Sequence, residues 1–100
     1  MLAPTPRERL VDPQGRPYFL WDVEMTLDEF EQALRDDASP AYAYLVAKVM
    51  RQAKPDDALQ FVTPQQMADL WPSIERHLGK TRPFWAWLLE QWERRGFVKR

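Results

Sequence analysis

The chain has 100 residues, of which 45% are hydrophobic, and a formal net charge of −1. This composition is typical of one globular domain, and the lack of cysteine excludes disulfides, thiol nucleophiles and thiolate metal sites. No apolar run approaches the ~20 residues of a membrane span, and the first six residues do not resemble a secretory signal. We therefore expect a cytoplasmic protein with no membrane partner.

The charges are unevenly distributed along the chain. Residues 1–44 hold four arginines against nine acidic residues, a net charge of −5. Residues 45–100 hold ten lysines and arginines against six acidic residues, a net charge of +4. This asymmetry is compatible with opposed binding surfaces, although charged faces that simply solvate the fold are the commoner explanation.

The first part of the chain lacks helical spacing. Residues 1–17 contain four of the nine prolines and few apolar side chains, which predicts a flexible, extended arm before a single helical domain over residues 18–100. Apolar and acidic side chains then alternate over residues 18–25, which is the spacing of a strand. A lone strand must lie along helices, pair within a dimer or join the sheet of a partner.

Capping signals and apolar spacing predict a series of helices after this segment. The sequence Thr26-Leu27-Asp28-Glu29 is a capping box that begins a helix ending near Asp37. Ser39-Pro40 begins the next helix, which ends before Pro55. The apolar stripe of this second helix consists of Tyr42, Leu45, Val46, Val49, Met50 and Ala53.

The second half of the chain continues the helical pattern. A helical turn is expected over residues 56–59, and the capping box Thr63-Pro64-Gln65-Gln66 begins a longer helix. Within it, Pro72 predicts a kink or two abutting short helices. The last helix begins at Thr81 and ends at the glycine stop of Gly96. Together these elements predict an all-α fold, a compact bundle of four or five short helices.

Several aromatic residues lie off the apolar stripes of their own elements. Trp87 falls beside the face that the other large apolar residues of the last helix share, and Tyr44 is off its stripe in the same way. Because a large ring is costly to leave in water, such residues need a second packing partner, inside or outside the fold. The simplest hypothesis is that the segment around Trp21 packs across Tyr44 and Trp87, either in the same chain or in a second copy of it. Of these, we favour burial of Trp21 within the chain and an interface for Trp87. The candidate partner-binding residues are Tyr18, Trp21, Tyr44 and Trp87.

No catalytic or ligand-binding signature is found in the sequence. His77 is the only histidine, and a lone histidine on a polar helical face is typically a surface residue. The serines and threonines are explained as helix caps, no calcium-loop spacing occurs, and there is no glycine-rich phosphate loop. We therefore expect no catalytic residue, no cofactor or metal site and no small-molecule ligand, and we do not expect an enzyme.

The basic residues make nucleic-acid binding an alternative to protein binding. Lysines and arginines gather before the last helix and at the C-terminus, where they could neutralise phosphates. The candidate residues are Arg76, Lys80, Arg82, Arg94 and Arg95. The last helix, however, carries tryptophans and outward-facing glutamates, which suits major-groove reading poorly, and the C-terminal ends of helices favour cations in any case. A small DNA-binding or autoregulatory protein is therefore the second hypothesis, ahead of a purely structural domain.

One sequence pattern carries a resemblance to a known group of proteins. The segment Arg16-Pro17-Tyr18-Phe19-Leu20-Trp21-Asp22, followed by a capped acidic helix, resembles short all-α bacterial proteins that look like partners of abortive-infection nucleotidyltransferase toxins. Residues 47–57 and 59–63 are similar as well, whereas Glu24 and Met25 stand where we expect a second aspartate and a leucine. The resemblance implies an antitoxin-like role and brings no catalytic residues. We therefore expect a non-catalytic protein-binding module whose partner is another protein, such as a toxin, or a second copy of the chain.

Overall fold

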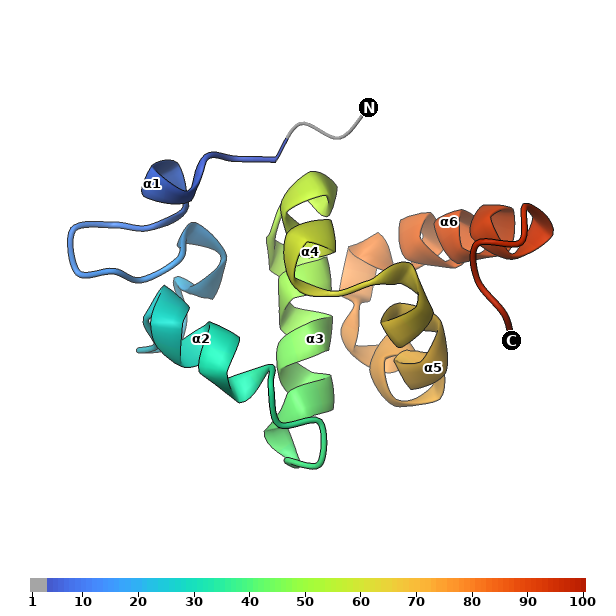
Figure 1. Cartoon of the computed structure of the whole chain (residues 1–100), viewed down its shortest axis with the longest axis horizontal. Coiled ribbons are helices and arrows are strands. Elements are labelled where there is room, and N and C mark those ends of the chain that lie inside the picture. The colour runs from blue at the N-terminus through green and yellow to red at the C-terminus, as the bar shows by residue number, and fades with distance from the viewer. Residues whose placement is uncertain (1–3) are drawn as a thin grey trace.

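The computed structural model describes residues 4–100, and helix α3, Ala41–Gln52, lies at its centre (Figure 1). The helix begins directly after the predicted Ser39-Pro40 signal, where the hydroxyl of Ser39 accepts a hydrogen bond from the backbone N–H of Ala41 (3.2 Å). All six residues of the predicted apolar stripe are buried. This helix therefore supplies the surface on which the rest of the molecule packs.

The other helices are short. They are α1 (Arg7–Leu10), α2 (Leu27–Ala33), α4 (Pro55–Phe61), α5 (Pro64–Ile74) and α6 (Arg82–Arg94), with 3-10 turns at Tyr18–Leu20, Glu75–His77 and Gly79–Thr81. Helices α2, α4 and α5 pack directly on α3, and α6 packs on α5. Over residues 4–100 the chain forms helices and no strand, so the predicted all-α fold is confirmed. No helix in this part of the chain is long and apolar enough to cross a membrane.

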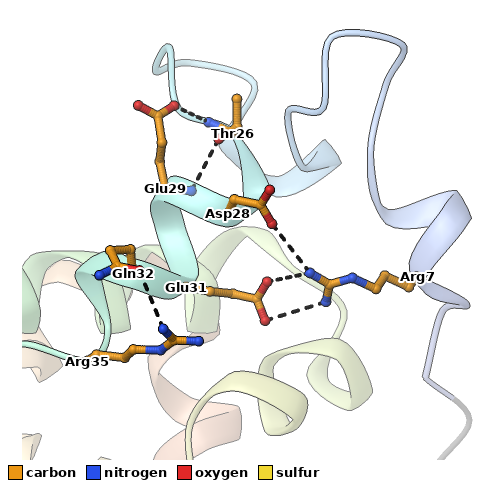
Figure 2. A network of polar contacts seen from close by, with 7 residues as sticks. All are labelled: Arg7, Thr26, Asp28, Glu29, Glu31, Gln32 and Arg35. Atoms are coloured by element: carbon orange, nitrogen blue, oxygen red, sulfur yellow. Dashed lines mark hydrogen bonds and ion pairs between the residues drawn. The ribbon is translucent and has the colours of Figure 1, made fainter.

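Both predicted capping boxes are present. In α2, the hydroxyl of Thr26 accepts a hydrogen bond from the N–H of Glu29 (3.1 Å), and the carboxylate of Glu29 accepts one from the N–H of Thr26 (2.9 Å), as Figure 2 shows. Thr63 and Gln66 make the same two hydrogen bonds at the start of α5. These pairs satisfy N–H groups that have no partner in the first turn of a helix.

Helix α6 ends at the predicted glycine stop. Gly96 has a φ of +80°, in the left-handed region that glycine favours. The N–H of Phe97 donates to the carbonyl of Trp92 (2.9 Å), and the N–H of Gly96 donates to the carbonyl of Glu93 (3.1 Å). This hydrogen-bond pattern is that of a Schellman motif, which satisfies carbonyl groups at a helix C-terminus.

The interruption predicted at Pro72 occurs slightly later in the chain. Helix α5 continues through Pro72 to Ile74 and then tightens into the 3-10 turn Glu75–His77. Gly79, with a φ of +56°, begins the next 3-10 turn. The connection from α5 to α6 therefore consists of abutting short helical pieces, one of the two outcomes that the proline predicts.

The strand predicted over residues 18–25 is wrong. The chain instead forms the 3-10 turn Tyr18–Leu20 and a following turn. The neighbouring side chains of Phe19 and Leu20 are both buried, which does not fit the predicted strand with one apolar and one acidic face. The carbonyl of Phe19 accepts a hydrogen bond from the side-chain amide of Gln52 in α3 (2.6 Å). The backbone thus finds a partner without a strand ladder.

Trp85 joins the last helix to the core. Its side chain is buried, and its indole N–H donates to the carbonyl of Met50 (2.9 Å). That carbonyl is among the last four of α3, which have no partner inside the helix. Leu89 is buried beside it on the predicted core face, whereas Phe84 from the same predicted face is exposed.

The described part of the predicted arm, residues 4–17, lies against the helical domain, and residues 1–3 lie outside the described residues. The side chain of Leu10 is only 1% exposed. Arg7 forms an ion pair with Glu31 of α2 (2.5 Å; Figure 2), and Thr5 donates two hydrogen bonds to a carboxylate of α4. Flexibility of this segment stays a prediction, but its contacts tie it to two helices.

Candidate functional site

A surface hollow of about 660 Å³ lies beside α3, between the turn that follows Leu20 and the 3-10 turns that precede α6. Its lining combines aromatic and cationic side chains. The lining residues are Trp21, Asp22, Tyr44, Ala47, Lys48, Arg51, Gln52, Arg76, His77 and Gly79. Because the hollow brings together two of the four predicted partner-binding residues, we take it as the candidate site and call it the Trp21–Tyr44 hollow.

Two large aromatic side chains are exposed at this hollow. The exposed fraction is 74% for Trp21 and 52% for Tyr44. Tyr44 lies on α3 one turn before Lys48, whose ammonium group is 5.2 Å from the centre of the tyrosine ring, within the range of a cation–π contact. Exposed apolar area gathered at one place, rather than scattered singly over a surface, is typical of a binding site.

Polar contacts fix the turn that carries Trp21 to α3. The ammonium group of Lys48 donates to the carboxylate of Asp22 (2.8 Å), and the side-chain amide of Gln52 donates to its other oxygen (3.3 Å). Burial acts to lower the pKa of Lys48, but its contacts with Asp22 and Tyr44 outweigh burial and raise this pKa. The hydrogen bond from Lys48 lowers the pKa of Asp22. Both groups are charged at neutral pH, and their charges offset each other.

Arg51 and Arg76 bring two guanidinium groups to the hollow, and neither forms an ion pair with any residue that the structure describes. Arg51, in the last turn of α3, lies against Gly79, since a Cβ added there would be 3.5 Å from its Nε. The Nε of Arg76 donates to Nε2 of His77 (3.3 Å). Sequence reasoning missed Arg51, because a cation in the last turn of a helix is already explained by the helix dipole.

The predicted burial of Trp21 within the chain is wrong. In a 3-10 turn successive side chains are rotated by about 120°. Phe19 and Leu20 take core positions, so the next side chain faces the solvent. Within the chain, this segment does not pack across both off-stripe aromatics, because Trp21 lines a hollow with Tyr44 but not with Trp87. Packing across them in a second copy of the chain stays a prediction.

The other two predicted partner-binding residues lie elsewhere. The hydroxyl of Tyr18 donates to Asp57 (2.5 Å) and accepts from the backbone N–H of Lys54 (2.9 Å), so it makes structural contacts inside the fold. Burial, together with the hydrogen bond to Asp57, raises the pKa of Tyr18 to about 12. Trp87 is 56% exposed on α6 and is not among the residues that line the hollow.

The basic residues considered for nucleic-acid binding are spread over the 3-10 turns before α6 and the two ends of α6. Of the five, Arg76 lines the hollow. Arg82 forms an ion pair with Glu75 (2.9 Å), and Arg94 forms one with Glu90 (2.8 Å). Arg82 and Arg94 also stand at opposite ends of α6, whose 13 residues span roughly 20 Å. The arrangement therefore gives little support to a continuous phosphate-binding face.

Sequence reasoning also missed the buried carboxylate of Asp57. It accepts hydrogen bonds from the N–H (2.6 Å) and hydroxyl (2.7 Å) of Thr5, from the hydroxyl of Tyr18 (2.5 Å) and from the amide of Gln60 (3.3 Å). From the sequence, the Asp56-Asp57 pair is explained by the start of a helix, and no local signal separates its two members. These contacts tie the N-terminal segment and α4 together.

The hollow offers ion pairs, hydrogen bonds and apolar contacts, which is the chemistry of recognition. Within residues 4–100, no group of three or more histidine, aspartate or glutamate side chains is placed to hold a metal ion.

Comparison of the chain with protein-family models, with curated proteins and with solved structures found no match.

Proposed function

We propose that this chain is a non-catalytic protein-binding module and that the Trp21–Tyr44 hollow is its binding surface. The observation that carries the proposal is the combination of two exposed aromatic rings with two arginines that have no ion-pair partner among residues 4–100. Tryptophan, tyrosine and arginine dominate the binding energy of protein interfaces. Removing both rings from water on association stabilises a complex further.

The elements that carry the lining residues of the hollow are held firmly in the fold, which favours binding as well. Tyr44 and Arg51 lie on α3, whose apolar stripe is fully buried. The turn that carries Trp21 is held by the Lys48–Asp22 ion pair and by the hydrogen bond from Gln52 to the backbone of that turn. A surface that is already ordered loses less conformational entropy when it binds.

We further propose that the partner is a nucleotidyltransferase-type toxin and that the chain acts as its antitoxin-like partner in the cytoplasm. The support is the resemblance carried by residues 16–22 and 47–57, since these two segments contribute Trp21, Asp22, Lys48 and Arg51 to the hollow. The resembling segments thus supply a large part of the proposed surface.

The test is to look for a nucleotidyltransferase gene next to the gene for this chain, to co-express the two proteins and to analyse them by size-exclusion chromatography with light scattering. We expect a complex whose Kd rises by about 30-fold or more with Trp21→Ala or Tyr44→Ala, as for residues at the centre of an interface. The control is Phe97→Ala, which removes another exposed aromatic ring that does not line the hollow. This control should leave the Kd unchanged.

Three outcomes would contradict parts of the proposal. A complex that Trp87→Ala abolishes, while Trp21→Ala and Tyr44→Ala preserve it, would move the binding surface to α6. Lack of a complex, or of any neighbouring nucleotidyltransferase gene, would remove the antitoxin-like role. A dimer of the chain alone that Trp21→Ala dissociates would make a second copy the partner.

A further inference from the structure

We infer that the Trp21–Tyr44 hollow binds an acidic segment of the partner protein. In this arrangement carboxylates pair with Arg51 and Arg76, and an apolar side chain of the segment contacts the two exposed rings. The inference rests on the proposed protein-binding function and adds the chemistry of the partner.

The charges in the hollow do not cancel. The charge of Lys48 is offset by Asp22, 2.8 Å away. The remaining charged groups are the guanidinium groups of Arg51 and Arg76, and neither pairs with a carboxylate in the described part of the chain. Arg82, in contrast, is already paired on the adjacent helix. The hollow is thus net positive, and arginine prefers bidentate pairing with carboxylates.

The two arginines reach the hollow from different segments of the chain. Arg51 extends from the end of α3 and lies against Gly79, in the connection that also carries Arg76. The two guanidinium groups therefore reach the same hollow from different segments, with the rings of Trp21 and Tyr44 on its lining. Its volume, about 660 Å³, is that of a cleft for a small ligand. A cleft of this size can hold a few residues of an extended segment.

The charges of the hollow fit an acidic protein segment better than a nucleic acid. A nucleic-acid backbone needs several phosphates neutralised along its length. The hollow offers two arginines without an ion-pair partner in the described part of the chain and a Lys48–Asp22 pair whose charges cancel, which is too little positive charge for a continuous run of phosphates. The chain as a whole has a net charge of −1, so it has no general attraction for nucleic acid. A short segment with two acidic residues fits these charges better.

The experiment selects peptides on the intact protein from a displayed library of random short sequences. We expect the selected peptides to be enriched in aspartate and glutamate around one aromatic or aliphatic residue. The best peptide is then synthesised with fluorescein, and its Kd is measured by polarisation. A copy with every acidic residue changed to its amide and a labelled single-stranded oligo-dT serve as competing probes, and neither should bind comparably.

Variants then locate the binding site. We expect Arg51→Gln and Arg76→Gln each to raise the Kd of the acidic peptide by about tenfold or more, and added salt to raise it further. The control is Arg95→Gln, which removes the same charge from an exposed position outside the hollow. It should change the Kd by less than about twofold. Circular dichroism of each variant checks that the fold is retained.

Selected peptides without acidic enrichment would overturn the inference. An equal effect of Arg95→Gln would overturn it too, because the effect would then reflect net charge alone. Oligo-dT binding that is tighter and depends on Arg51 and Arg76 would replace it with a nucleic-acid site. If the peptide experiments give any of these results but Trp21→Ala abolishes the complex with the toxin, only the acidic-segment inference fails. If Trp21→Ala leaves that complex intact, the proposed function fails with it.

Discussion

The carboxylate of Asp57 is fully buried, yet Thr5, Tyr18 and Gln60 all donate hydrogen bonds to it. Burial acts to raise the pKa of Asp57, but these hydrogen bonds outweigh it and the pKa is lowered. A carboxyl group with a lower pKa in the folded state stabilises the fold above its unfolded pKa, and this stabilisation is lost as the pH falls through the folded value. Acid should therefore weaken the link between the N-terminal segment and α4.

Asp57→Asn is the variant that tests this pH dependence. We expect the free energy of unfolding at neutral pH to fall by about 1–3 kcal/mol, because buried donors lose a charged acceptor. The difference from the original chain should shrink as the pH is lowered below ~4, the ordinary range of an aspartate. Urea unfolding over a series of pH values measures this difference, with the exposed Asp37→Asn as a control. A difference that stays constant down to low pH would assign the effect to packing alone.

At the scale of elements, local signals predict helix ends well and predict non-helical segments poorly. The Thr26 and Thr63 capping boxes and the Gly96 stop depend on residues three to five positions apart in the chain, so a short window of sequence contains them. Residues 18–25 have strand-like alternation, but α3 decides their structure, since Gln52 binds the backbone of this turn. No local window contains that contact.

The N-terminal segment shows the same dependence on distant residues, and Leu10→Ala tests its contribution. Leu10 is almost fully buried, so the substitution should lower the free energy of unfolding by about 2–5 kcal/mol. Glu8→Ala, at an exposed position on the same short helix, should change it by less than about 0.5 kcal/mol. Thermal and urea unfolding measure both values. Equal, small effects of the two substitutions would show that the segment is a free arm, as its prolines predict.

At the scale of the whole molecule, the sequence predicts part of the candidate site. Tyr44 is singled out because it lies off the stripe of a strongly periodic helix, and it is exposed on that helix; its role in binding stays a prediction. Trp21 is singled out for the wrong reason, as a buried strand residue, and turns out to be exposed. The sequence could not predict that Arg51 and Arg76 lie in the same hollow as Trp21 and Tyr44. The contact between the end of α3 and the connection before α6 exists only in the folded chain.

DNA binding depends on the basic residues of the whole surface, and most of the candidate contacts lie outside the hollow. Arg82 and Arg94, at opposite ends of α6, form ion pairs with Glu75 and Glu90. Phosphate groups would have to displace these carboxylates before they could pair with the arginines. We therefore expect negligible binding of a labelled DNA duplex at physiological salt, measured by fluorescence polarisation. Real phosphate contacts would instead give a log–log dependence of affinity on salt with a slope of about −0.9 per contact. Should such a slope appear and become less steep in Lys80→Gln and Arg95→Gln, DNA binding would replace protein binding as the leading function.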